Sequence, residues 1–341
     1  NVNNGLSKNY KEMILMDLMH IWLFEVMKPK IAYNSFSRYE SVYRNYILKL
    51  DKLATRKVYA VTPLELQRLY NEMSKDGKSK SIILNLNKLL RTFFNYAILE
   101  GYITRNPTFK LTIPDNACDV DVVKDIDPFS DDEIGLIIDS AKDEVKFMYI
   151  LAFATGLRRG ELLGLRVKDV DLENSEIHVV NALKDVKDIE TSDKYTYKTV
   201  LEPPKTKSSI RSVPLPSSII SGFKSHINKQ KEKCISLGMP YNDDCFLFSS
   251  ESGNVLNSRN CIRAWERTLK RAGVRYRKFH NTLHTYATKL FEQGVPIKTV
   301  QKLLGHSNMI ITSEIYTHVM PKEKENAVDK LNFIFEKGIK N

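Results

Sequence analysis

The sequence predicts a mainly helical protein of two domains, with a small antiparallel β-sheet in the second domain. Apolar residues recur at helical spacing through most of the 341 residues. Three short segments rich in β-branched residues, 176–180, 198–202 and 210–215, interrupt this pattern after the midpoint and indicate the sheet. Residues 108–129 show no sustained period and contain two prolines, which is typical of a connection between domains.

The boundary between the domains is expected at this aperiodic stretch. The helical pattern before it ends at Pro107, because the residue before a proline is biased away from helix. After it, Ser130 is followed three residues later by a glutamate, which predicts a capped helix start. We therefore expect a helical domain over 1–110, a linker over 111–129 and a second domain over 130–341.

The first domain is predicted to be all-helical. Segments 14–26 and 39–50 have helical periodicity, and Thr62 followed by Pro63 has the form of an N-cap with proline at the first helical position. Residues 81–99 place six apolar side chains on one stripe: Ile82, Leu86, Leu89, Leu90, Phe93 and Ala97. Basic residues gather on the opposite side of this helix: Lys80, Lys88 and Arg91. These three are candidate contacts for a polyanion.

The second domain is predicted to open with helices at 131–142 and 145–155, followed by the sheet. Helical pattern returns from Ser217 to the end of the chain. Late in this part, Gly305 is expected to end a helix and to place His306 at the helix end.

The charge of the chain points to a polyanionic partner. Lys and Arg number 52 against 41 Asp and Glu, a net charge of +11. Residues 1–118 carry +8, residues 119–144 carry −8 and residues 145–341 carry +11. Two basic regions joined by an acidic one favour two units that each bind a polyanion, although basic surfaces that merely aid solubility would give the same total.

The sequence also excludes several classes of protein. No apolar run reaches about 18 residues, and the first thirty residues lack a secretory leader pattern, so we expect a cytoplasmic protein without membrane contact. The four cysteines lack the spacing of a zinc site or a disulfide framework. Because the chain begins at Asn1 without a Met, we expect that an N-terminal piece precedes it.

Four segments of the second domain place polar side chains where turn or core residues are the default. They are ATGLRRGELL at 154–163, PKTKSS at 204–209, FHNTLHTYAT at 279–288 and LLGHSNMIITSEIYTHV at 303–319. Their candidate functional residues are Arg158, Glu161, Lys205, Lys207, His280, His284, His306 and Tyr316. An arginine in a tight turn can hold a phosphate in a fork geometry. A single histidine or tyrosine, by contrast, is most often structural.

Together and in this order, the four segments resemble the tyrosine recombinase (phage integrase) family. The resemblance covers residues 130–320 and extends to residues 8–110, which look like the helical core-binding domain that precedes the catalytic domain. In detail the segments are most similar to integrases of Gram-positive phages and conjugative transposons. The resemblance implies a helical, SAM-like core-binding domain and an α+β catalytic domain that integrates or excises a mobile element at attachment sites in double-stranded DNA.

The resemblance implies a covalent reaction. Tyr316 would attack a DNA phosphate and form a 3′-phosphotyrosyl link, which conserves the bond energy, so that religation needs no ATP. Lys205 would protonate the leaving 5′ oxygen. Lys207 is the competing candidate for that proton transfer and otherwise a DNA contact, beside the three candidates of the first domain.

The remaining candidates would stabilise the transition state. Arg158 would hold the phosphate oxygens as charge builds on them, and Glu161 would orient the site. His280 and His306 would donate hydrogen bonds to the phosphate or move protons, with His284 in support. No metal ion or other cofactor is expected, because no carboxylate or His/Cys cluster has metal spacing.

One position departs from the family pattern. The family has His-x-x-Arg-His, whereas here the segment from His280 to His284 carries Leu283 in place of the second catalytic arginine. Losing one charged donor costs about 3–4 kcal/mol of transition-state stabilisation. Either Arg277 or Lys278 compensates, in which case the protein is an active recombinase, or the protein is impaired and acts as a non-enzymatic site-specific DNA-binding protein. Leu283→Arg is then expected to raise cleavage at least tenfold.

Partners follow from the end of the chain and from the resemblance. Pro321 begins a last helix with an apolar stripe: Ala327, Leu331, Ile334 and Phe335. This stripe either packs on its own domain or docks on a neighbouring copy. The resemblance implies docking in a homotetramer on DNA, with an excisionase, a host DNA-bending protein and an N-terminal arm-binding domain as further components.

Overall fold

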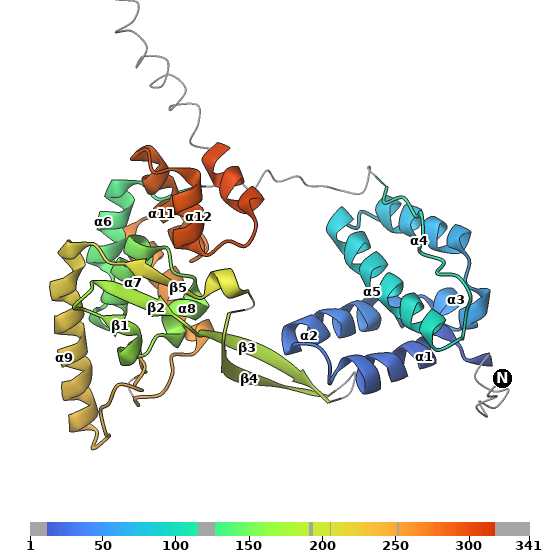
Figure 1. The fold of residues 1–341 in the computed structure, drawn as a ribbon, viewed down its shortest axis with the longest axis horizontal. Coiled ribbons are helices and arrows are strands. Elements are labelled where there is room, and N and C mark those ends of the chain that lie inside the picture. Colours follow the sequence, from blue (N-terminus) through green and yellow to red (C-terminus); the bar gives the residue numbers. More distant parts are fainter. Residues whose placement is uncertain (1–11, 115–126, 191–193, 205, 251, 318–341) are drawn as a thin grey trace, which may run out of the picture. The chain divides into compact units, whose positions relative to one another are not determined.

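The chain divides into two compact units (Figure 1). The computed structural model describes residues 12–114, 127–190, 194–204, 206–250 and 252–317. The first unit comprises Asn1–Asp125 and Val186–Lys198, and the second comprises Ile126–Asp185 and Thr199–Asn341. The fold is mainly helical with small β-sheets, as the sequence predicts. Among the described helices, none is both long and apolar enough to cross a membrane.

The first unit is built from short helices. They are α1 (Leu15–Ile21), a π-helix (Trp22–Met27), α2 (Tyr33–Val42), a π-helix (Tyr43–Ile47), α3 (Asp51–Ala54), a 3₁₀ turn (Val58–Ala60), α4 (Pro63–Lys75) and α5 (Lys80–Leu99). Helix α4 begins at the predicted cap, where the Thr62 hydroxyl accepts a hydrogen bond from the Glu65 backbone N–H. The helix predicted at 39–50 begins earlier, at Tyr33. Its first turn is largely exposed, so the apolar pattern in the sequence did not reveal this start.

Helix α5 forms the centre of the core of this unit. Its fully buried side chains are Ile83, Leu86, Leu89, Leu90, Phe93, Phe94 and Ala97. The sequence pattern placed Ile82 in this stripe, but Ile83 is the deeper residue. The Phe93 ring meets the Trp22 ring edge to face, with 5.5 Å between their centroids. Full burial of such side chains is worth roughly 1.5–3 kcal/mol each, so this helix anchors the unit.

The second unit combines helices with a three-stranded sheet. Its helices are α6 (Asp131–Ser140), α7 (Asp143–Thr155), α8 (Arg159–Gly164), α9 (Ile220–Ser236), α10 (Ser258–Ala272), α11 (Asn281–Glu292) and α12 (Ile297–Leu304). Residues 309–317 form a further helical segment. The strands β1 (Val170–Asp171), β2 (Glu176–Val179) and β5 (Arg211–Pro214) form an antiparallel sheet in the order β1-β2-β5. The predicted cap at Ser130 is present at the start of α6.

The composition of the sheets differs from the prediction. Segments 176–180 and 210–215 do pair, as β2 and β5, but 198–202 belongs to β4 (Tyr195–Glu202), which pairs with β3 (Ala182–Ile189) in a separate two-stranded sheet. Strand β3 was not predicted because its sequence lacks the alternation of a strand. Its buried side chains, Leu183, Val186 and Ile189, recur every third residue.

Two apolar clusters hold the second unit together. In the larger one, the Trp265 ring of α10 packs against the rings of Tyr149 and Phe279, with centroids 5.0 and 5.2 Å away. The smaller one, called here the α11–α12 cluster, contains Leu283, Ala287, Phe291, Val300, Leu304 and Ile315. Because α11, α12 and the 309–317 helix share this cluster, it fixes the parts of the chain that carry the last two sequence motifs.

Candidate active site

Arg158 lies in a tight turn between α7 and α8. Helix α7 ends at Gly156 in the left-handed conformation, with φ of 62°. A Cβ atom on Gly156 would lie 2.4 Å from Cδ1 of Tyr286, so α11 packs directly on this turn. Arg158 is the N-cap of α8, and its backbone N–H donates to Glu161 Oε2 at 2.9 Å. The turn therefore fixes the backbone from which the Arg158 side chain projects.

Gly156→Ala is expected to destabilise the second unit by about 2–3 kcal/mol, because it adds left-handed strain to an overpacked contact. Gly273 provides a matched control, since it also ends a helix in the left-handed conformation but has no atom within 4 Å of an added Cβ. Thermal unfolding of both variants measures the difference. Equal losses at the two glycines would contradict the close packing of Tyr286 on the turn.

The Glu161 carboxylate is buried and is shared by two arginines. Its side chain is 3% exposed. Arg158 Nη1 donates to Oε1 at 2.9 Å, while Arg211 donates from Nη1 to Oε1 at 3.1 Å and from Nη2 to Oε2 at 3.0 Å. Burial favours a raised pKa for Glu161, but the hydrogen bonds and charge of Arg211, with the charge of Arg158, lower the pKa below its ordinary value. Glu161 is therefore a carboxylate at neutral pH.

Arg211 was not among the residues singled out from the sequence. It begins β5, and its side chain is 6% exposed. Its Nε donates to the Leu303 carbonyl at 2.7 Å, and its Nη1 also donates to the Ser209 carbonyl at 3.1 Å. One signal was present in the sequence: strand alternation puts Arg211 on the same face as Val213, which is buried. A buried arginine requires a partner carboxylate.

His306 lies at the end of α12, as the sequence predicts. Gly305 ends this helix with φ of 64°, and an added Cβ would lie 3.0 Å from Arg211 Nη1. The His306 side chain is buried, and its Nδ1 lies 2.9 Å from the Thr312 hydroxyl. Burial, followed by the charges of Arg158, His280, Arg211 and His284, lowers the pKa of His306 to about 4. The imidazole is therefore neutral at pH 7.

His280 and His284 lie together at the start of α11. His280 is the N-cap residue of this helix and is exposed, whereas His284 is half-buried one turn later. Their ring centroids are 4.9 Å apart, with the rings edge to face. Because the charges of both act on His306, the structure brings the predicted histidines into one electrostatic neighbourhood with Arg158.

Tyr316 lies on the 309–317 helix at the edge of the α11–α12 cluster. The residue is half-buried, and its ring meets the Phe291 ring edge to face with 5.1 Å between centroids. Its neighbour Ile315 is buried within the cluster. The cluster therefore contacts the ring of Tyr316 and fixes the position of this side chain.

Leu283 is fully buried in the α11–α12 cluster. Arg277, one of the two candidates for partial compensation, is bound by carboxylates near the start of the second unit. The Arg277 Nε donates to Asp127 at 2.6 Å and its Nη1 donates to Glu133 at 2.8 Å. Its guanidinium also lies over the Phe129 ring, 4.6 Å from the centroid. Arg277 is therefore engaged by two carboxylates in this structure, whereas Lys278 is exposed.

Several predicted positions lie outside the part that the structure describes. These are Lys205, the side chain of Lys207 and the last helix after Pro321. The structure thus leaves the choice between the two lysines, and the docking of the last helix, as predictions.

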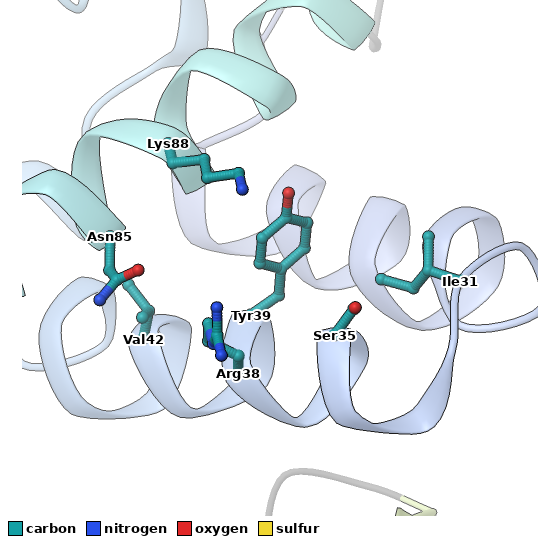
Figure 2. A pocket seen from close by; sticks show the side chains of 7 residues that line it. All are labelled: Ile31, Ser35, Arg38, Tyr39, Val42, Asn85 and Lys88. Atoms are coloured by element: carbon teal, nitrogen blue, oxygen red, sulfur yellow. The ribbon is translucent and has the colours of Figure 1, made fainter. Parts of the chain in front are cut away.

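The basic candidates of the first unit lie along α5. Lys88 and Arg91 are exposed, and Lys80 is the first residue of the helix. Figure 2 shows Lys88 beside a cavity of about 200 Å³, which Arg38 of α2 and Asn85 of α5 also line. None of the described residues that line this cavity is acidic. The surface between α2 and α5 is therefore suited to an anionic partner.

Among the described residues, one group of possible metal ligands lies on the β1–β2–β5 sheet. Ligand atoms of Asp171, Glu176 and His178 lie within 4.8 Å of one another. The Asp171 carboxylate already accepts hydrogen bonds from the backbone N–H groups of Glu173 and Asn174, which closes the turn between β1 and β2. The turn and the pairing of β1 with β2 therefore account for the proximity of these three side chains without a metal ion.

Comparison with known families and proteins agrees with this arrangement. The profile of the phage integrase family matches residues 128–323, and that of the phage integrase N-terminal SAM-like domain matches residues 14–74. A tyrosine recombinase XerC-like protein of Caldanaerobacter subterraneus subsp. tengcongensis is 46% identical over 340 residues, covering 98% of this chain and 86% of its own length. The transposase from transposon Tn916 of Enterococcus faecalis is 26% identical, covering 93% of this chain and 77% of its own.

Solved structures share the fold. The Tn1549 transposon integrase in complex with a circular intermediate DNA matches with a TM-score of 0.70 and 22% identity, covering 92% of this chain and 99% of that one. A lambda integrase tetramer bound to a Holliday junction matches with a TM-score of 0.58 and 20% identity, covering 89% and 77%.

Proposed function

This chain belongs to the phage integrase family, and we propose that it cleaves and rejoins double-stranded DNA at attachment sites through Tyr316, integrating or excising a mobile element. The observation that carries the proposal is the cluster of positive and titratable groups around His306. Arg158 and Arg211 both bind the buried Glu161 carboxylate, and Arg211 also donates to the Leu303 carbonyl, three residues before His306. The rings of His280 and His284 lie edge to face, and the charges of all four residues lower the pKa of His306. Such a cluster suits a phosphate group that gains charge in the transition state.

In the proposed reaction, Tyr316 Oη loses its proton to the solvent and attacks the phosphorus while the bond to the 5′ oxygen breaks. The leaving oxygen takes its proton from Lys205, with Lys207 as the alternative donor. The product is a 3′-phosphotyrosyl link and a free 5′-hydroxyl, and attack by another 5′-hydroxyl reverses the step without ATP. The reaction needs no metal ion or other cofactor.

Arg158 and the histidines serve the phosphate in this proposal. Among the described residues, the Arg158 guanidinium makes one hydrogen bond, to Glu161, so its other N–H groups remain for phosphate oxygens. When the Thr312 hydroxyl donates to Nδ1 of His306, the proton of that imidazole is on Nε2 and can be donated to the phosphate. His280 and His284 supply further donors from α11.

DNA binding would extend to the first unit through Lys80, Lys88 and Arg91. Four copies would assemble on two duplexes, coupled through the last helix of each chain. Support comes from solved family members in DNA complexes, one of them a lambda integrase tetramer on a Holliday junction. An excisionase and a host DNA-bending protein would set direction, and the reaction would take place in the cytoplasm.

A second candidate function is site-specific DNA binding without cleavage. Leu283 favours it, because an apolar, fully buried side chain supplies no charge to the phosphate.

A suicide substrate distinguishes the two functions. The probe is a duplex carrying the joint of the circular form of the element, nicked next to the cleavage position so that the short fragment is lost. We expect a protein–DNA adduct that resists SDS and is removed by proteinase K. The short fragment that is released is expected to carry a 5′-hydroxyl that polynucleotide kinase can label. Specific binding of the joint sequence without any adduct would favour the non-enzymatic function.

A further inference from the structure

We propose that Arg211 is a positioning residue for strand cleavage, because it neutralises Glu161 and thereby leaves the positive charge of Arg158 for the DNA phosphate. This inference rests on the proposed function and deepens it.

The sharing of Glu161 between the two arginines is unequal. Arg211 binds both carboxylate oxygens in a fork, whereas the guanidinium of Arg158 binds one of them. The three charges sum to +1, and the fork makes Arg211 the main counter-charge of Glu161. The positive charge that remains is therefore that of Arg158.

Exposure separates the two arginines further. The Arg158 side chain is 32% exposed and the Arg211 side chain 6%. Arg211 also donates to the carbonyls of Leu303 and Ser209, which commits most of its N–H groups inside the unit. Arg158 is thus the arginine that a phosphate can reach, and Arg211 acts through Glu161.

Removal of Arg211 would change the balance. Glu161 is 3% exposed, and a buried carboxylate that loses its main partner binds the next available cation more tightly. That cation is Arg158, which already contacts Oε1. The pair would then be neutral, and an incoming phosphate would have to compete with Glu161 for the same guanidinium.

Arg211 also stabilises the local structure, so the experiment must separate two effects of its removal: the loss of its charge beside Glu161 and the loss of its hydrogen bonds to the backbone. Its bond to Leu303 and its contact with Gly305 join β5 to the turn that carries His306. Loss of these contacts alone would weaken the site in Arg211→Met whether or not Glu161 is charged. The double variant Glu161→Gln with Arg211→Met loses the same contacts but restores the charge of Arg158.

The experiment compares the parent protein with Arg211→Met, Glu161→Gln and the double variant. On the suicide substrate, Arg211→Met is expected to form the adduct at least 100-fold more slowly, and the double variant at least tenfold faster than Arg211→Met. On a random-sequence 30-bp duplex, the slope of log affinity against log salt is expected to fall by about 0.9 in Arg211→Met, as for loss of one phosphate contact, and to recover in the double variant. Arg158→Met, which removes the contact itself, is the reference for that loss.

Rescue by the second substitution decides the inference. A double variant no better than Arg211→Met in both assays would overturn it, because scaffolding alone would then explain the loss. Where Arg211→Met fails to fold, Arg211→Gln, alone and with Glu161→Gln, makes the same comparison with a polar side chain. If the parent forms no adduct but the salt slopes follow the expected order, the proposed cleavage fails while the positioning of Arg158 stands.

Discussion

Tyr316→Phe is expected to abolish the SDS-resistant adduct while leaving the melting temperature and the affinity for duplex DNA unchanged. The substitution removes only the hydroxyl group. The ring keeps its edge-to-face contact with Phe291 and its place at the α11–α12 cluster. Because the phenol oxygen forms the covalent link in the proposed reaction, its loss is expected to remove the reaction rather than slow it.

The adduct assay on the nicked duplex measures this effect, with thermal unfolding and anisotropy of a labelled duplex as checks on fold and binding. Tyr276→Phe is a suitable control, because Tyr276 is an exposed tyrosine of the same unit. It is expected to form the adduct at the rate of the parent. An adduct that persists in Tyr316→Phe would show that another residue is the nucleophile.

Features determined by neighbouring residues could be predicted from the sequence. The caps at Thr62 and Ser130 depend on a glutamate three residues later, and both are present. The ends of α7 and α12 likewise depend on a single glycine at each helix end. The positions of Arg158 and His306 next to these helix ends could therefore be predicted from the sequence.

Features that depend on distant residues could not be predicted in the same way. Arg211 and Glu161 are fifty positions apart, and only the fold brings the strand that carries one to the helix that carries the other. Arg277 was one of two nearby cations that the sequence offered as partial compensation for Leu283, the alternative being an impaired protein. Its guanidinium instead binds Asp127 and Glu133, from the start of the second unit. Proximity in sequence therefore does not show where a cation lies when carboxylates distant in the sequence bind it.

Leu283→Arg is expected to lower the stability of the second unit and to slow adduct formation. Leu283 is fully buried among Ala287, Phe291 and Ile315, so the arginine would lose this packing and place a charge in an apolar cluster. Removing a buried leucine to alanine costs about 2–5 kcal/mol, and an unpaired charge adds to that cost. This reverses the expectation from the sequence alone, that an arginine here would raise cleavage at least tenfold.

Two further substitutions separate packing from charge at this position. Leu283→Met conserves volume, so it is expected to cost less than about 1.5 kcal/mol and to retain the adduct. Leu283→Ala opens a cavity without a charge, and it is expected to slow the adduct because the cluster supports both α12, which ends before His306, and the helix that carries Tyr316. Melting temperature and adduct rate are measured for all three variants. If Leu283→Arg melted like the parent and cleaved faster, the guanidinium would have to leave the cluster and reach the phosphate, and packing would not be what position 283 contributes.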